Sequence, residues 1–362
     1  MKKYLFFIII IGVVLVVSCS KNTDVTVNTS NPIDTPATPF NLIAPFGFPP
    51  IIIPNNNKMT VEGIALGRKL FYDPMLSLDN SQSCGSCHNQ RFAFTDSTLQ
   101  FSKGITGEIG TRNAMPIMNL AWERKFFWDG GAATLEDQVI GPITNPIEMH
   151  ETLNNVLSKL NKHNEYPRLF KRAFGTDSIT TQLLMKAVAQ FERTIISANS
   201  KYDKYVRGEA ELTFDELKGK ELYEDQKKGD CFHCHVLGST FTDFDFRNNG
   251  LDSIFTDLGR YKNTLKETDK GKFKTPSLRN IELTAPYMHD GRFKTLDEVL
   301  EHYNSGFKVT SQNLAADIAL AEKGRLSNEE KQQIIAFLKT LTDTEFINNP
   351  NFKKPLTNEK FN

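Results

Sequence analysis

Two short motifs in the sequence combine a pair of cysteines with a histidine at fixed spacing. They are Cys84-Gly-Ser-Cys87-His88 and Cys231-Phe-His-Cys234-His235. In this pattern one turn of backbone carries both thiols, and the histidine that follows can ligate a metal. The pattern is typical of covalent haem attachment, in which the thiols add to the vinyl groups and the histidine binds the iron. The sequence therefore predicts two c-type haems, with His88 and His235 as iron ligands.

The same cysteines allow a second interpretation, a zinc site built from two Cys-x-x-Cys pairs. This alternative does not explain why a histidine follows both pairs. It also fits poorly with the amino terminus, which has the features of an export signal. Of the five cysteines in the chain, the motifs use four and the amino-terminal segment contains Cys19, so none is left for a structural disulfide.

The amino terminus predicts a segment that does not belong to the fold. Lys2 and Lys3 precede an apolar run over 5–17, which is short for a transmembrane helix. The run ends in Val16-Val17-Ser18-Cys19, which resembles a bacterial lipobox. We expect a signal peptide at 1–18, a lipid on Cys19 and a protein anchored to a membrane in the periplasm. The alternatives are an uncleaved anchor or plain secretion.

Residues 19–57 are predicted to be a flexible tether, because Thr, Asn, Pro and Ser dominate this stretch and cannot bury a core. The apolar part at 46–54 is expected to pack on the first domain. Lysine plus arginine equals aspartate plus glutamate, 43 against 43. This balance gives no basic bias that would indicate nucleic acid binding.

The rest of the chain has a duplicated organisation. A short amphipathic helix precedes each motif, and a helix with apolar i, i+3, i+4 spacing follows more than a hundred residues later. The last of these helices begins with a capping box from Ser327 to Glu330. We predict a mainly α fold with two cytochrome c-like haem domains in tandem, at 58–207 and 208–345, and a C-terminal tail at 346–362.

The ligand on the far side of each iron determines whether a haem carries electrons or reacts. Between Asn89 and Met149 the sequence contains no histidine. Met115, Met118 or a remote residue would have to close the first haem. The absence of a nearby histidine favours an open iron.

Several further stretches resemble the bacterial di-haem cytochrome c peroxidase family, and more narrowly its MauG branch. The resemblance extends over about 63–343. The stretches that carry it are Phe92-Ala-Phe-Thr-Asp96, Gly110-Thr-Arg-Asn-Ala114, Phe127-Trp-Asp-Gly130, Gly141-Pro-Ile-Thr-Asn-Pro-Ile-Glu-Met149, Phe191-Glu-Arg-Thr194, Thr275-Pro-Ser-Leu-Arg-Asn280 and Thr284-Ala-Pro-Tyr-Met-His-Asp-Gly291.

The resemblance implies that hydrogen peroxide reacts at the haem on His88. Glu148 matches the family's acid/base, and Gln138 and Pro142 match other residues of that pocket. A carboxylate suits this role, because O–O cleavage requires a proton to move from one peroxide oxygen to the other. The histidine that closes this haem in other members is missing, so we expect a haem that needs no reductive activation.

The resemblance also implies features between the haems. Trp128 matches an electron relay, and its alternative role is that of a buried aromatic anchor. Asn113 and the backbone oxygens of Thr284 and Pro286 match a calcium site, whose neutral oxygen ligands suit a hard cation. The alternative is that these three residues only shape a turn.

The second haem differs from most of the family at its far-side ligand. Tyr303 stands where other members have a methionine, and the MauG branch has a ligating tyrosine there. The helix is bounded by a capping box at Thr295 and Glu298 and by Gly306. Tyr303 shares a face with apolar residues, so a core tyrosine is the alternative. The other candidate ligands are Met288, then His289 and His302.

These features together predict an enzyme, a di-haem peroxidase. Electrons would come from a c-type cytochrome or another redox donor and pass through the second haem. The main alternative is a MauG-like oxidase that uses peroxide to oxidise residues of a partner protein. A third hypothesis is an electron-transfer cytochrome with both irons closed.

Overall fold

The computed structural model describes residues 36–96, 99–319 and 326–356 of the 362-residue chain. The predicted signal peptide and Cys19 lie outside the described residues. The helices are α1 (Val61–Phe71), α2 (Cys84–Cys87), α3 (Leu135–Gln138), α4 (Ile140–Thr144), α5 (Leu153–Lys162), α6 (Tyr166–Phe174), α7 (Thr181–Thr194), α8 (Lys201–Val206), α9 (Phe214–Glu224), α10 (Tyr261–Thr264), α11 (Leu296–Glu301), α12 (Ala316–Ala319) and α13 (Asn328–Lys339).

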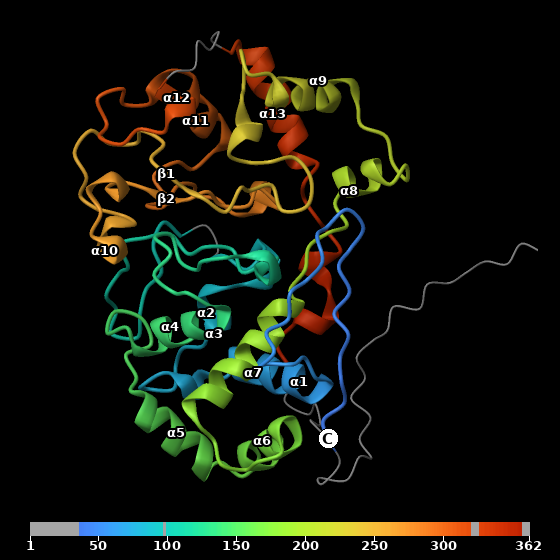
Figure 1. The fold of residues 1–362 in the computed structure, drawn as a ribbon, viewed down its shortest axis with the longest axis vertical. Coiled ribbons are helices and arrows are strands. Elements are labelled where there is room, and N and C mark those ends of the chain that lie inside the picture. The colour runs from blue at the N-terminus through green and yellow to red at the C-terminus, as the bar shows by residue number, and fades with distance from the viewer. Residues whose placement is uncertain (1–35, 97–98, 320–325, 357–362) are drawn as a thin grey trace, which may run out of the picture.

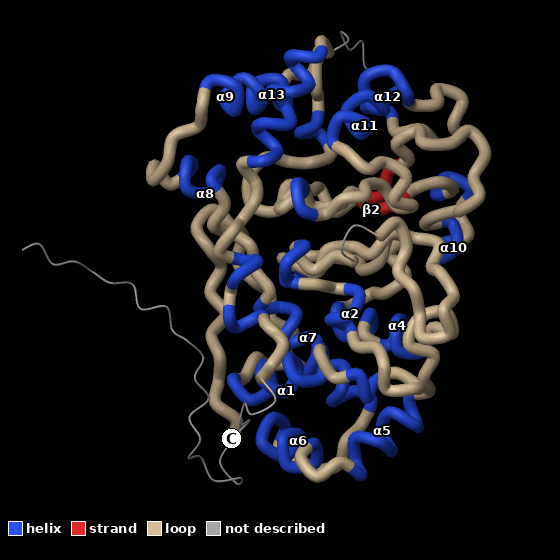
Figure 2. The backbone as a smooth tube through the Cα atoms, turned by 180° about the vertical axis from the view of Figure 1, so that it is seen from behind, coloured by secondary structure: helices blue, strands red, loops and turns tan. Residues whose placement is uncertain are grey.

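The mainly helical class is confirmed. Long loops join the helices (Figure 2), and the strands of the described residues are β1 (Phe246–Arg247) and β2 (Phe273–Lys274), paired antiparallel. Within the described ranges, no helix combines the length and the apolar character needed to cross a membrane.

In the first half of the chain, α1 precedes the first cysteine motif in the sequence and crosses α7. The crossing is close because Gly67 has no side chain. A Cβ atom added there would lie 1.9 Å from the carbonyl oxygen of Ala187, and Phe191 packs beside it. The sequence pattern that predicted helices before and after the motif is therefore realised as one tightly packed pair.

The second half repeats this arrangement with α9 and α13. A Cβ atom added to Gly219 would lie 1.8 Å from the carbonyl oxygen of Gln333. The predicted capping box is confirmed, since Ser327 and Glu330 exchange side-chain and backbone hydrogen bonds at the start of α13. Equivalent glycines thus allow equivalent helix crossings in both halves.

Each helix pair is the centre of its own hydrophobic core. Figure 1 shows the two halves of the chain stacked along the long axis. Tyr202, on α8, is buried in the second core, and its backbone N–H donates to Thr340. The predicted domain boundary at 207/208 is therefore too late, because α8 already packs with the second half.

The C-terminal segment returns to the first half (Figure 1). Phe346 and Phe352 are buried in the first core, with ring centroids 5.7 and 6.4 Å from that of Phe94. The side chain of Gln90 donates to the carbonyl oxygens of Phe346 and Asn349, at 3.1 and 2.9 Å. The prediction of a tail is wrong for 346–353, because burial of the two aromatic rings ties this segment to the first core.

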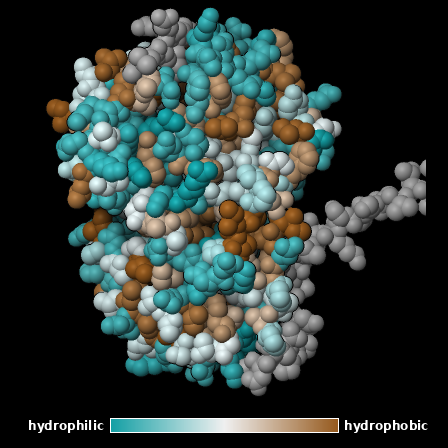
Figure 3. Space-filling view, viewed as in Figure 1, coloured by the Kyte–Doolittle hydropathy of each residue, from teal (hydrophilic) through white to brown (hydrophobic). Residues whose placement is uncertain are grey.

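The part of the predicted tether that the structure describes, from residue 36 onward, also packs against the folded protein. Asn57 is buried, and its side-chain nitrogen donates to Glu136 at 2.6 Å. The ring of Phe48 contacts Trp122 from the first half and Arg279 from the second, at 4.9 and 4.8 Å. The prediction of a tether is therefore wrong for 38–57, and the expectation that the apolar part at 46–54 packs on the first domain holds at Phe48 and Ile53. Figure 3 shows apolar residues gathered at mid-height, where the halves meet.

Candidate active site

The first cysteine motif forms α2 and ends at His88, whose ring is held by the backbone. Its Nδ1 lies 2.8 Å from the carbonyl oxygen of Phe94. Ala93 and Phe94 have φ values of 52° and 61°, in the left-handed region, and this turn brings the carbonyl back to the histidine. With Nδ1 donating to Phe94, Nε2 is the atom left to bind iron.

The second motif repeats this geometry at His235. Its Nδ1 lies 3.3 Å from the carbonyl oxygen of Phe241. As in the first motif, this residue stands six positions after the histidine and has a positive φ, here 52°. Burial lowers the pKa of both histidines, so both rings are held in the neutral form that ligates metals. The donor atoms in each half thus fit a covalently attached haem.

The two cysteine pairs line different cavities. Cys84 and Cys87 line the first cavity together with His88, and Cys231 and Cys234 line the second together with His235. A zinc site that shares all four thiols would need one common cavity. The arrangement therefore favours haem attachment over the zinc alternative.

The first cavity also contains the three residues expected in a peroxide pocket. Gln138 comes from the end of α3, Pro142 from α4 and Glu148 from the loop that follows. The carboxylate of Glu148 accepts a hydrogen bond of 2.7 Å from the side chain of Asn145. Burial raises the pKa of Glu148, which brings it closer to the range of an acid/base near neutral pH.

Neither methionine considered as a far-side ligand lines the first cavity. Met118 is buried, and its sulfur instead accepts a hydrogen bond of 3.2 Å from Asn280. Met149 does line the cavity, next to Glu148. Among the described residues that line it, His88 is the one histidine.

Glu192 also lines this cavity, although its place in the stretch Phe191-Glu-Arg-Thr194 did not predict a role for it. It lies on α7, is 2% exposed, and lines the first cavity. It accepts a hydrogen bond of 2.6 Å from the side-chain nitrogen of Gln138. Burial raises the pKa of Glu192 to about 8. A signal for Glu192 was present in the sequence. It is an acidic residue four positions after Val188, on the face of the predicted helix that should be buried.

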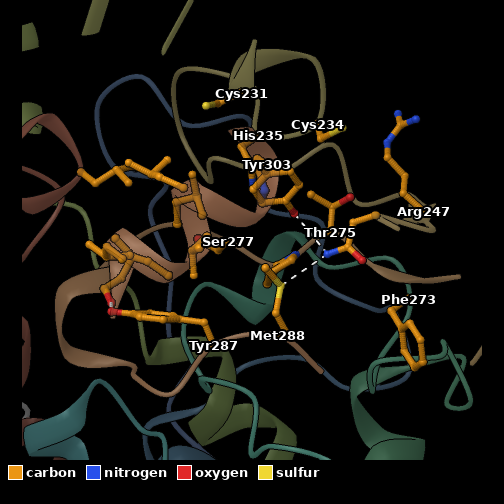
Figure 4. Close-up of a pocket in the computed structure, with 18 of the residues that line it drawn as sticks. Cys231, Cys234, His235, Arg247, Phe273, Thr275, Ser277, Tyr287, Met288 and Tyr303 are labelled. Atoms are coloured by element: carbon orange, nitrogen blue, oxygen red, sulfur yellow. Dashed lines mark hydrogen bonds between the residues drawn. The ribbon is translucent and has the colours of Figure 1, made fainter. Parts of the chain in front are cut away.

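The second cavity contains both leading candidates for its far-side ligand (Figure 4). Tyr303 and Met288 line it together with His235. The side-chain nitrogen of Asn249 donates to Tyr303 Oη at 3.2 Å and to Met288 Sδ at 3.4 Å. Burial raises the pKa of Tyr303 to about 12. The metal-free phenol is therefore neutral, and a bound ferric iron would have to displace its proton.

Tyr303 lies just after α11, in a π-helical segment from His302 to Gly306. The predicted capping box of this helix, Thr295 with Glu298, is confirmed. A π-helical turn widens the helix and changes the direction of the side chains after it, a feature frequent at functional sites. The periodicity of the sequence predicts one regular helix here and gives no sign of the π-helical turn.

The two weaker candidates are engaged elsewhere. His302 Nε2 lies 3.0 Å from the backbone oxygen of Asn249, and the His302 side chain does not line the second cavity. His289 lines the cavity, and its ring stacks on Phe273 with centroids 3.6 Å apart. These contacts leave Tyr303 and Met288 as the better-placed pair.

The residues expected between the haems line the second cavity. Trp128 Nε1 donates to the backbone oxygen of Asn113 at 2.8 Å. The side-chain nitrogen of Asn113 donates to the carbonyl oxygens of Leu99 and Gln100, at 3.2 and 3.1 Å, so its Oδ1 is the atom left for a cation. Thr284 and Pro286 line the same cavity as Asn113. This neutral oxygen set has the chemistry that calcium prefers.

The chain is similar to known proteins over most of its length. It is 35% identical over 292 residues to the methylamine utilization protein MauG of Methylophilus methylotrophus, covering 80% of this chain and 84% of that protein. It is also 35% identical over 305 residues to the cytochrome c551 peroxidase of Nitrosomonas europaea, covering 80% and 82%.

A solved structure gives the same relationship. A MauG-like protein associated with microbial copper homeostasis matches with a TM-score of 0.79 and 35% identity, over 87% of this chain and 99% of that one. The family model described as di-haem cytochrome c peroxidase matches residues 61–211. The chain therefore belongs to the di-haem cytochrome c peroxidase family, in its MauG-like branch, and is a peroxidase-type oxidoreductase.

Proposed function

We propose that this protein reduces hydrogen peroxide in the first cavity, with electrons delivered through the second cavity from a c-type cytochrome or another redox donor. One observation carries the proposal. Glu148 and Gln138 line the same cavity as Cys84, Cys87 and His88. A haem attached there supplies the iron on which peroxide is reduced.

The chain's own residues supply positioning and proton transfer. His88 presents Nε2, because Nδ1 is held by the backbone of Phe94. Glu148, held by Asn145, takes a proton from one peroxide oxygen and returns it to the other. Pro142 cannot donate a backbone hydrogen bond, and it forms an apolar part of the wall.

In the second cavity, Tyr303 is proposed to close the iron bound by His235, with Met288 as the alternative. Trp128 is proposed to carry electrons between the two haems. It borders the second cavity, and its indole nitrogen is held by Asn113. Asn113, Thr284 and Pro286 are proposed to bind one calcium ion, which metal analysis before and after treatment with a chelator would test.

The experiment that tests the function is the addition of hydrogen peroxide to the ferric protein, followed by optical and EPR spectra. A resting spectrum with one high-spin ferric haem and a rapid response to peroxide is expected. Two low-spin haems and no response would contradict the proposal and favour an electron-transfer cytochrome.

A second candidate function is oxidation of residues in a partner protein, as a MauG-like oxidase. The observation that favours it is Tyr303 in the second cavity, since an anionic oxygen ligand stabilises oxidised iron. Steady turnover with reduced cytochrome c supports the peroxidase. A peroxide-induced spectral change with poor cytochrome turnover supports the oxidase.

The proposed location is the periplasm, with the protein anchored to a membrane through a lipid on Cys19. The support is the lipobox-like Val16-Val17-Ser18-Cys19. Metabolic labelling with a fatty acid tests this proposal, because label should enter the wild type and be absent from a Cys19→Ser variant.

A further inference from the structure

The second cavity contains an asparagine whose amide contacts both candidate ligands. The side-chain nitrogen of Asn249 lies 3.2 Å from Tyr303 Oη and 3.4 Å from Met288 Sδ, and dashed lines in Figure 4 mark both hydrogen bonds. All three residues line the cavity that contains His235. Because the amide nitrogen carries two N–H groups, it can donate to both acceptors at the same time.

The chemistry of the two acceptors determines which end of the amide suits them. A thioether sulfur carries no hydrogen, so Met288 Sδ can only accept. A phenol oxygen that has lost its proton in order to bind iron can likewise only accept. If the amide were turned round, the lone pairs of its Oδ1 would face both atoms. The nitrogen of Asn249 is therefore the end that suits an iron-bound Tyr303, and it is the end that faces Tyr303 in the structure.

The backbone around Asn249 is held from both sides. Its carbonyl oxygen accepts a hydrogen bond of 3.0 Å from Nε2 of His302. The preceding residue, Asn248, is buried, and its side-chain nitrogen donates to Ser311 Oγ at 2.8 Å and to the backbone oxygen of Gln312 at 2.7 Å. These contacts do not involve the haem, so they hold the donor in place before a ligand of the iron needs it.

We propose that Asn249 is a positioning residue of the second haem, which holds the Tyr303 oxygen and raises the reduction potential of that haem through its hydrogen bond. The inference rests on the proposed closure of the iron by Tyr303, and it names a residue to which neither the motifs nor the resemblance assigns a role. Ferric iron draws charge from a phenolate oxygen more strongly than ferrous iron does. The oxygen is therefore more negative in the reduced state, and the hydrogen bond stabilises that state more.

The variant Asn249→Leu tests the proposal, because leucine removes the donor and keeps nearly the same side-chain volume. At a given applied potential, the ratio of ferrous to ferric second haem should fall about tenfold, the size expected for one hydrogen bond to a charged group. For a one-electron couple this is a fall of about 59 mV in the reduction potential. Potentiometric titration followed by EPR distinguishes the low-spin signal of this closed haem from the high-spin signal of the first.

The sign of the shift separates this role from a loss of structure. A variant that lets Tyr303 leave the iron loses the anionic ligand, so its potential should rise and not fall. Asn249→Val also lacks a donor, and it should lower the potential even if the leucine variant does not fold. Asn57→Leu is the matched control, because the amide of Asn57 donates to Glu136 and to the backbone of Lys186 in the first half. It should lower the temperature of unfolding and leave the potential of the second haem unchanged.

Double-mutant cycles identify the acceptor that carries the effect. In a Met288→Leu background, Asn249→Leu should still lower the potential. In a Tyr303→Phe background the fall should be absent, because a thioether is only a weak acceptor. The proposal is overturned if the potential of Asn249→Leu rises or equals that of the wild type, or if the fall persists without Tyr303. A second haem that shows the expected shifts in a protein whose first haem ignores peroxide would support this inference and contradict the proposed function.

Discussion

Tyr303 and Met288 receive hydrogen bonds from the same donor, the side-chain nitrogen of Asn249, at 3.2 and 3.4 Å. The phenol oxygen and the thioether sulfur therefore lie within reach of one atom, on the wall of the cavity that contains His235. Both candidate ligands of the second haem therefore lie at one place in this cavity.

The first prediction concerns the ligand of the second haem. Tyr303→Phe removes the anionic oxygen, so the reduction potential of this haem should rise by on the order of 0.1 V, within the roughly 0.8 V that axial ligands span. Potentiometric titration followed by absorbance measures the change. Met288→Leu should leave the potential near that of the wild type. A changed potential in Met288→Leu together with an unchanged potential in Tyr303→Phe would identify Met288 as the ligand.

The second prediction concerns Glu148. Glu148→Gln should lower the rate constant for reaction with peroxide by about 10²–10⁴-fold, because the proton acceptor is lost. Stopped-flow absorbance gives this rate constant. Glu221→Gln is the control, since Glu221 is exposed and pairs with Lys218. An unchanged rate constant in Glu148→Gln would exclude Glu148 as the base.

The pH profile of the wild type should follow the same residue. Burial raises the pKa of Glu148, and the reaction needs its carboxylate form. The rate should therefore fall as the pH falls through this raised pKa, at a higher pH than for an ordinary glutamate of about 4.3. In Glu148→Gln this acidic limb should be absent.

The motif residues could be predicted from the sequence because the two thiols and the histidine are contiguous, and the helix periodicity and capping boxes are local. The contact between Glu192 and Gln138 could not be predicted, because the two residues come from different helices. The packing of Phe346 and Phe352 depends on Phe94, far away in the sequence. The composition of 38–57 indicated a tether, but this stretch is held by contacts with residues far away in the sequence. The hydrogen bond from Asn57 to Glu136 is one of them, and local composition does not reveal it.

The third prediction concerns the junction between the halves. Arg112, from the first half, donates to Asp129 at 2.7 Å and to Asp257, from the second, at 2.6 Å. Arg112→Leu should lower the free energy of unfolding by about 1–2 kcal/mol, a value reduced for partial exposure. Urea unfolding measures it. Lys218→Leu, at an exposed pair, should have almost no effect.

The stabilisation that Arg112 provides should depend on pH in one direction. Burial opposes ionisation of Asp257, but hydrogen bonds from Arg112 and Lys262 outweigh it and hold the pKa of Asp257 below its usual range. The stabilisation is thus complete above the unfolded value of about 3.9 and is lost as the pH falls towards the folded pKa. The difference between wild type and Arg112→Leu should shrink over that range. A difference that grows at low pH would contradict this account.

The fourth prediction concerns the helix crossings. Gly219→Ala places a Cβ atom 1.8 Å from the carbonyl oxygen of Gln333, so α9 and α13 must separate. The free energy of unfolding should fall by about 1–3 kcal/mol, and a lower temperature of thermal unfolding would show this loss. Gly110→Ala is the control, because its nearest neighbour would be 3.6 Å away. Equal unfolding temperatures for the two variants would show that the crossing can relax.

The return of Phe346 and Phe352 to the first core has a consequence for how the protein is made. The half that begins near the amino terminus cannot complete its interior until residues 346–352 have been synthesised. The second half, whose core lies within 202–341, can close earlier. The thiols of Cys84 and Cys87 therefore belong to the half that closes last, which leaves time for covalent attachment before the chain seals around them.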